Sequence, residues 1–244
     1  MAAKRTVTKD NGELQTLLDP AISAGADSAQ PVIGPDRRMD LIIPAIEPGI
    51  VALTIVGLTP LLVCAWSEKA RRQMLEKQMK KPKKALPAKD PQADYLASLY
   101  VSTEGWTGIP AGGVKGCLVN TCRLVDGLPM TLAKRLCFVR SQGQTKEGKQ
   151  LVRVYGEHEL HENPVRINNG AGTDIRFRAV YPRWSINLEI EYLKNVISAE
   201  QVANLMELAG WGEGLCEWRP GAPKNNTGDH GRFKIKRDEE PVNA

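Results

Sequence analysis

The chain has 244 residues, of which 42% are hydrophobic and 25% charged, so it can bury an ordinary core in one large domain or two small ones. This composition excludes a chain that is disordered throughout. The net charge of +5 and the pI near 8.9 are modest for a nucleic-acid-binding protein, so its cations would have to be clustered to form a binding surface.

Both ends of the chain lack the pattern of a folded segment. Residues 1–38 are rich in Ala, Gly, Ser, Asp and Pro without a sustained period, which predicts a disordered arm, and 237–244 form a disordered tail. Between them we expect a single α+β domain at 39–236. The first residues contain no apolar run, so we expect no signal peptide and a cytoplasmic protein, in the host cell if a phage encodes it.

The segment from Ile50 to Trp66 is almost continuously apolar and close to membrane-spanning length. Gly57, Thr59 and Pro60 interrupt it, and the half before them is rich in β-branched residues. We therefore predict two buried strands, or one strand with a bend, and no membrane helix.

Residues 67–90 are predicted to form a basic insertion. Ser67 is a plausible N-cap for a mostly solvated helix over 67–80, and prolines that include Pro87 and Pro91 should keep the following residues out of helical geometry. The insertion is either a cationic binding segment or a solvated linker. Its cations are Lys69, Arg71, Arg72, Lys77, Lys80, Lys81, Lys83, Lys84 and Lys89.

The first of two glycine-rich stretches contains Gly112, Gly113 and Gly116 and continues into apolar positions that predict a helix over 114–125. Lys115 would lie near the first turn of this helix and Arg123 near its last. A helix N-terminus carries partial positive charge, so a phosphate could bind there.

The remaining elements alternate between helices and strands. We expect a short helix at 131–135 and Ser198 as the cap of a long helix that ends at Gly210. The predicted strands are 136–139, 150–155, 173–184, 185–192 and 231–235. The order of these elements indicates an α+β fold.

The second glycine-rich stretch holds Gly210, Gly212 and Gly214 and is followed by Arg219. Residues from Trp218 to Phe233 predict either a binding site with Arg219 and Arg232 as cationic rims or simply a β-hairpin. The tryptophans Trp184, Trp211 and Trp218 either stack on bases or belong to the core.

The residues Ile109 to Leu118 read Ile-Pro-Ala-Gly-Gly-Val-Lys-Gly-Cys-Leu. They resemble the isoleucine-proline, small residues, hydrophobic, lysine-glycine signature near the first helix of the RAMP superfamily, the RNA-binding backbone subunits of CRISPR effector complexes. Those proteins have a ferredoxin-like, RNA-recognition-motif type fold with an antiparallel sheet, and often a C-terminal glycine-rich loop, here 210–214. The chain also resembles small uncharacterised proteins of tailed phages and prophages. Glu213 and Glu217 depart from the pattern, because a phosphate-binding loop favours cations.

The resemblance implies sequence-tolerant binding of single-stranded nucleic acid, RNA favoured, in a homo-oligomer or with other phage or CRISPR-like subunits. It assigns phosphate contacts to Lys115 and Arg123. The residue pattern adds further cations, among them strand arginines whose alternative is a solvated sheet face: Lys134, Arg135, Arg176, Arg178 and Arg183.

Catalytic chemistry has little support in the sequence. The five cysteines contain no CxxC pair and suggest buried thiols in a reducing compartment. His158 and His161 lack the helical spacing of a zinc site, so a surface loop is expected there. No metal or cofactor is predicted and we do not expect an enzyme. The alternatives are a phage structural or protein-interaction protein, and an RNA endonuclease that uses His230.

Overall fold

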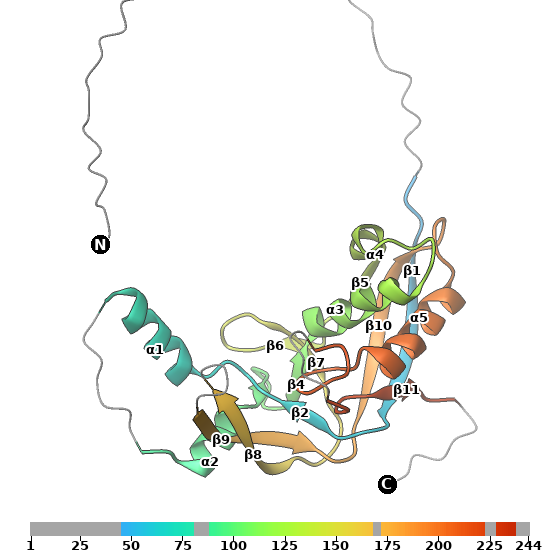
Figure 1. Cartoon of the computed structure of the whole chain (residues 1–244). Coiled ribbons are helices and arrows are strands. Elements are labelled where there is room, and N and C mark those ends of the chain that lie inside the picture. The colour runs from blue at the N-terminus through green and yellow to red at the C-terminus, as the bar shows by residue number, and fades with distance from the viewer. Residues whose placement is uncertain (1–44, 81–87, 168–171, 223–227, 238–244) are drawn as a thin grey trace, which may run out of the picture. The chain divides into compact units, whose positions relative to one another are not determined.

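The computed structural model describes residues 45–80, 88–167, 172–222 and 228–237, all of which belong to one compact unit, 45–244 (Figure 1). The arm predicted for 1–38 and nearly all of the tail predicted for 237–244 lie outside these residues. No helix in the described ranges has the length and apolar character to cross a membrane.

Four strands form the central antiparallel sheet, in the order β11-β1-β10-β5. Along the chain they are β1 (Pro48–Gly57), β5 (Cys137–Val139), β10 (Ser185–Leu193) and β11 (Phe233–Ile235). Helix α3 (Ala111–Thr121) connects β1 to β5, and α5 (Ala199–Gly212) connects β10 to β11. This βαββαβ order with spatial order 4-1-3-2 is the ferredoxin-like topology, so the predicted fold class is confirmed.

Long insertions extend this frame. Between β1 and α3 lie β2 (Leu61–Val63), α1 (Glu68–Gln78), α2 (Pro91–Ala97), β3 (Tyr100–Val101) and β4 (Thr107–Pro110). Between β5 and β10 lie β6 (Gly143–Gln144), β7 (Gln150–Arg153), β8 (Glu159–Ile167) and β9 (Gly172–Tyr181). A 3-10 turn (Cys122–Leu124) and α4 (Met130–Leu136) follow α3. The inserted strands pair into two further antiparallel sheets, β2-β9-β8 and β3-β4-β7-β6.

The period-2 pattern of β10 places the core on one side of the central sheet. Ile186, Leu188 and Ile190 are buried, while Asn187 and Glu189 between them are exposed. Helices α3 and α5 contact each other and strands of this sheet, so they cover its apolar face (Figure 1). The opposite face of β10 is polar.

The caps explain where the helices begin. Ser198 and Gln201 form a capping box at α5, as predicted. The Ser67 hydroxyl accepts a hydrogen bond from the Ala70 N–H at the start of α1, and α1 buries no residue, also as predicted. The expectation that Pro91 keeps the chain out of a helix is wrong, because Pro91 occupies the first position of α2, where a helix needs no N–H donor.

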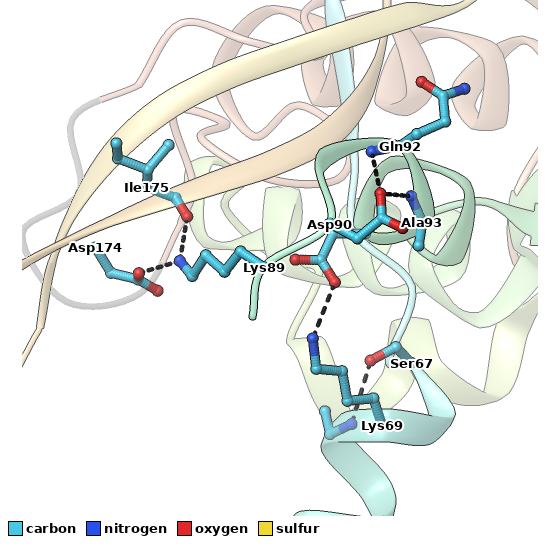
Figure 2. Close-up of polar contacts among 10 residues, drawn as sticks. Ser67, Lys69, Lys89, Asp90, Gln92, Ala93, Asp174 and Ile175 are labelled. Atoms are coloured by element: carbon cyan, nitrogen blue, oxygen red, sulfur yellow. Dashed lines mark hydrogen bonds and ion pairs between the residues drawn. The ribbon is translucent and has the colours of Figure 1, made fainter. Parts of the chain in front are cut away.

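The carboxylate of Asp90 caps α2 by accepting hydrogen bonds from the N–H groups of Gln92 and Ala93 (Figure 2). Figure 2 also shows Lys89 donating to Asp174 and to the carbonyl of Ile175 on β9. Lys69 of α1 pairs with Asp94 at 3.3 Å. Two cations of the basic insertion therefore hold it to neighbouring elements, and residues 81–87 lie outside the described residues.

Several predicted boundaries are wrong for identifiable reasons. Helix α5 continues through Gly210 to Gly212, because Gly210 packs against β11 rather than ending the helix. The strand predicted at 173–184 ends at Tyr181, before the turn at Pro182. The surface loop expected around His161 is strand β8, which tolerates Pro164 because it lies at a sheet edge.

The hairpin predicted between Trp218 and Phe233 is also not observed among the described residues. Glu217 instead makes an isolated bridge to Leu62, and Trp218 adopts a positive φ of 56°. Leu215 donates a backbone hydrogen bond to Gly231. The segment is therefore a series of turns packed beside β2, and residues 223–227 lie outside the described residues.

Candidate nucleic-acid interface

The two glycine-rich stretches meet at a cavity of about 280 Å³. Gly113, Gly116 and Asn120 of α3 line one side, and Gly214 and Arg219 belong to the segment after α5. Other lining residues include Cys64, Tyr100, Cys117, Glu213, Cys216 and Glu217. The fold thus brings together stretches about a hundred residues apart.

The first stretch is helical rather than a loop. Helix α3 begins at Ala111, three residues earlier than predicted, so Gly112 and Gly113 belong to its first turn. Pro110 is the N-cap and provides no side-chain hydrogen bond. The N–H groups of the first turn have no partner within the helix and no capping side chain, so they are donors suited to an anion.

Gly112, Gly113 and Gly116 form what we call the open glycine face of α3. A Cβ atom built on any of the three would meet nothing within 4 Å. Glycine costs up to about 1 kcal/mol relative to alanine at a helical position. Packing within the described residues gives no reason to accept this cost, and the glycines leave helix backbone bare toward the cavity and the solvent.

Four cations lie on α3 or on the elements that follow it in the chain. The Nζ atom of Lys115 lies 3.7 Å from the ring centroid of Phe138, which is 49% exposed. Arg123 is exposed and its Nε donates to the Met130 sulfur at 3.4 Å. Lys134 and Arg135 are exposed in the last turn of α4, which packs on α3 and β5. None of these four cations joins an ion pair between described residues.

Phe138 is a site residue that the sequence reasoning missed. It lies on β5 opposite Glu191, on the face of the central sheet that the helices do not cover. No clear signal in the sequence indicates it, because residues 136–139 are all apolar and do not show which side chain is exposed. An exposed ring beneath an ammonium group combines a stacking surface with a phosphate-binding charge.

The acidic residues that depart from the signature have internal roles. Glu213 is 9% exposed, and its carboxylate accepts a hydrogen bond of 2.9 Å from the Asn120 side chain. The Nε atom of Arg219 lies 3.8 Å from the same carboxylate, and another of its nitrogens donates to the Cys216 carbonyl at 2.7 Å. Glu213 therefore links α3 to the following turns, and Arg219 is largely used within the fold.

The thiols beside the cavity are kept protonated by burial. Burial raises the pKa of Cys216 to about 12 and raises the pKa of Cys117 as well. Burial also raises the pKa of Tyr100 to about 12. All five cysteines are free, and no group of three or more His, Cys, Asp or Glu in the described ranges could hold a metal ion. These thiols are structural and weakly nucleophilic.

The strand arginines do not form the predicted row. Arg176 and Arg178 lie on β9, which belongs to the inserted sheet rather than to the central one. Arg176 is exposed, but Arg178 is only 3% exposed, so neither a phosphate-binding row nor a solvated face describes it. Arg183 is exposed in the turn between β9 and β10. The prediction that Arg176 and Arg178 lie on the same face of a strand was correct. The sequence does not show that this face is covered at Arg178.

The three tryptophans singled out in the sequence lie in different environments, and Arg232 is next to one of them. Trp184 is 5% exposed and donates to the Thr59 carbonyl, so it belongs to the core. Trp211 is 67% exposed and has Arg232 over its ring at 4.5 Å. Trp218 packs edge-on against His230 at 6.0 Å. Of these three tryptophans, Trp211 is the one with the exposure that base stacking requires.

The open face of the central sheet is not strongly cationic. Arg140 pairs there with Glu189 at 3.0 Å and with Glu191 at 2.9 Å, so positive and negative groups alternate. His230 lies elsewhere, with its ring 6.4 Å from that of His161. Burial, followed by the neighbouring His161, lowers the pKa of His230. The four cations without ion-pair partners among the described residues lie instead on α3, the turn after it and α4.

No protein-family model and no curated protein matches the chain. A chain from "Cryo-EM structure of the Type III-B Cmr-beta bound to cognate target RNA" is similar in structure, with a TM-score of 0.45 and 13% sequence identity. The similarity covers 78% of this chain and 59% of that chain, so this chain spans less than two thirds of its neighbour's length. The ferredoxin-like assignment rests on the strand order of the structure itself.

Proposed function

We propose that the chain binds single-stranded nucleic acid, RNA favoured, through backbone phosphates and with little sequence preference. The observation that carries the proposal is the open glycine face of α3. The packing of the fold requires none of the three glycines; Gly112 and Gly113 lie in the uncapped first turn, and Gly116 lies in the next turn. Phosphate oxygens would accept hydrogen bonds from these N–H groups, which a Cβ atom would partly cover.

The surrounding cations supply the attraction at longer range. Lys115, Arg123, Lys134 and Arg135 lie on or beside α3 without ion-pair partners among the described residues. Phe138 offers a ring for an unpaired base beside Lys115. A duplex keeps its bases stacked inside, so this combination favours single strands. The preference for RNA rests on the resemblance of residues 109–118 to the RAMP signature, as does assembly into an oligomer.

Binding is measured by fluorescence anisotropy with labelled single-stranded RNA, single-stranded DNA and duplex across a salt series. The variant Lys115→Ala/Arg123→Ala should bind at least tenfold more weakly at low salt. Loss of two phosphate contacts should also reduce the slope of log K against log salt by about 1.4 for a single strand. Lys146→Ala, an exposed cation between β6 and β7, is the matched control and should bind as the wild type does.

No binding at low salt, or equal binding by the double variant and the control, would contradict the proposal. We also expect that the protein binds the strand without cleaving it. The labelled strand should be recovered intact after incubation. Cleavage that disappears in His230→Ala would favour the endonuclease alternative instead.

A second candidate function has its own observation. Helix α1 buries no residue, and Trp66, Met74 and Leu75 are each about half exposed or more. An exposed basic helix with apolar residues is also suited to docking on an acidic protein partner, as a phage structural or interaction protein would require. Retention of nucleic-acid binding after Met74→Ser/Leu75→Ser would separate this surface from the α3 interface.

A further inference from the structure

The inserted sheet β2-β9-β8 contains a buried cation whose hydrogen bonds are incomplete. Arg178 of β9 is 3% exposed, and its Nε and Nη1 atoms are buried without a hydrogen-bond partner. The carboxylate of Glu217 lies 4.0 Å from Nη1, beyond hydrogen-bond distance, and that side chain is 45% exposed. A buried guanidinium normally requires close counter-charge and full hydrogen bonding.

A second unpartnered side chain lies on the same face. Asn163 of β8 is 4% exposed, and both its amide nitrogen and its amide oxygen lack a hydrogen-bond partner. The register pairs His161 with Arg178 and Asn163 with Arg176, so all four belong to one face of the sheet. Asn163 is therefore the diagonal neighbour of Arg178, within reach of a long side chain.

His161 is the cross-strand partner of Arg178, and a second imidazole, that of His230, lies next to His161. The ring centroid of His161 lies 6.4 Å from that of His230, and Trp218 packs edge-on against His230. The backbone N–H of His230 donates to the backbone carbonyl of Trp218 at 3.0 Å, which fixes the main chain at this point. Imidazole nitrogens can donate hydrogen bonds in either protonation state.

Four acids lie near these residues, and one of them, Asp229, directly precedes His230 and raises its pKa against the lowering by burial. Asp174 is paired with Lys89, as Figure 2 shows, and this hydrogen bond is the main reason that the pKa of Asp174 is lowered. Glu159 is exposed opposite Val180. Glu217 is thus the acid that lies near Arg178, at its long distance. These acids leave N–H groups of the Arg178 guanidinium without hydrogen bonds. A compact oxyanion would accept those hydrogen bonds.

We propose that Arg178, Asn163, His161 and His230 form a binding site for a phosphate group. The guanidinium would supply charge and hydrogen bonds, and the Asn163 amide and the imidazoles would donate to the remaining oxygens. The phosphate is either free inorganic phosphate or the terminal phosphate of a strand. This inference stands on residues other than the α3 interface and does not depend on the proposed function.

The test follows the Nε–H resonance of Arg178 in ¹H–¹⁵N NMR spectra of the whole chain, assigned by its absence in Arg178→Met. The ligands are inorganic phosphate, a 5′-phosphorylated trinucleotide and the same trinucleotide with a 5′-hydroxyl. We expect a saturable shift with a phosphate source. Shifts with both phosphate sources indicate that the site binds inorganic phosphate. A shift only with the 5′-phosphorylated strand indicates that the site binds the terminal phosphate of a strand.

Asn163→Asp is the decisive variant, because it gives Arg178 an internal counter-charge and should stay folded while repelling phosphate. We expect its phosphate affinity to fall at least tenfold. Arg153→Met, which removes an exposed arginine of β7, should bind as the wild type does. The absence of a saturable shift with both phosphate sources, or equal affinity of Asn163→Asp and the wild type, would overturn the proposal.

Discussion

The two glycine-rich stretches look alike in the sequence but differ in why they contain glycine. In α5, a Cβ atom on Gly210 would lie 2.1 Å from the Phe233 carbonyl oxygen, so the fold requires glycine there. In α3, the open glycine face meets nothing within 4 Å. A glycine that packing requires therefore says little about ligands. A helical glycine that costs stability and has no packing role indicates contact with another molecule.

The largest expected effect is at the packed glycine. Gly210→Ala should lower the free energy of unfolding by about 3 kcal/mol, because neither α5 nor the backbone of β11 can move away without losing core contacts. Urea unfolding followed by circular dichroism measures the change. A decrease in the free energy of unfolding below about 0.5 kcal/mol would show that the contact between Gly210 and Phe233 tolerates a methyl group. Packing would then not explain the glycine at this position.

The folded chain should become less stable at high pH, in part because of the contact between α3 and α5. The Cys117 thiol lies 3.7 Å from the Ala209 carbonyl of α5, and burial raises its pKa; burial also raises the pKa of Cys137 from 9.0 to about 11. Above pH 9 the unfolded chain loses these thiol protons while the folded chain keeps them, so stability falls as pH rises.

Each buried thiol should remove about 1.4 kcal/mol of stability per pH unit above 9, until the pH reaches its folded pKa. Urea midpoints between pH 7 and pH 10 measure this loss. Cys117→Val keeps the packing without a titrating group and should show a shallower decline. An identical decline in the variant would exclude Cys117 as its source.

A third glycine tests conformation rather than packing. Gly214 has a φ of +71°, and a Cβ there would lie 3.0 Å from side-chain atoms of Arg219 and Pro220. Gly214→Ala should destabilise the chain by about 1–2 kcal/mol, since an L-residue is strained in this region. Thermal unfolding provides the measurement, and Gly212→Ala, where the nearest atom is 3.4 Å away, is the matched helical control.

The sequence predicted the frame of the molecule well because local patterns specify it. The alternation of β10 and the Ser198 capping box are local signals, and both elements appear where expected. Two errors have different origins, because the first depends on a tertiary contact and the second on a local helix-start signal that was misinterpreted. Gly210 was expected to end α5, because its contact with Phe233 was unknown, and Pro91 was expected to prevent a helix that it in fact begins.

The candidate site was predictable only in part. Lys115 and Arg123 follow from the helix pattern, and the structure places a half-buried Lys115 on α3 and an exposed Arg123 in the turn after it. The burial of Arg178 was not predictable, since the same alternation fits an exposed and a covered strand face. Asn163 was missed because Pro164 and the charged residues around it obscure strand β8.

The open glycine face supports the most direct test of the account. In the variant Gly112→Ala/Gly113→Ala/Gly116→Ala each alanine should stabilise α3 by about 0.5–1 kcal/mol, because nothing within the described fold opposes its methyl group. Urea unfolding and anisotropy with single-stranded RNA are measured on the same preparation. The account predicts higher stability together with at least tenfold weaker binding, and higher stability with unchanged binding would contradict it.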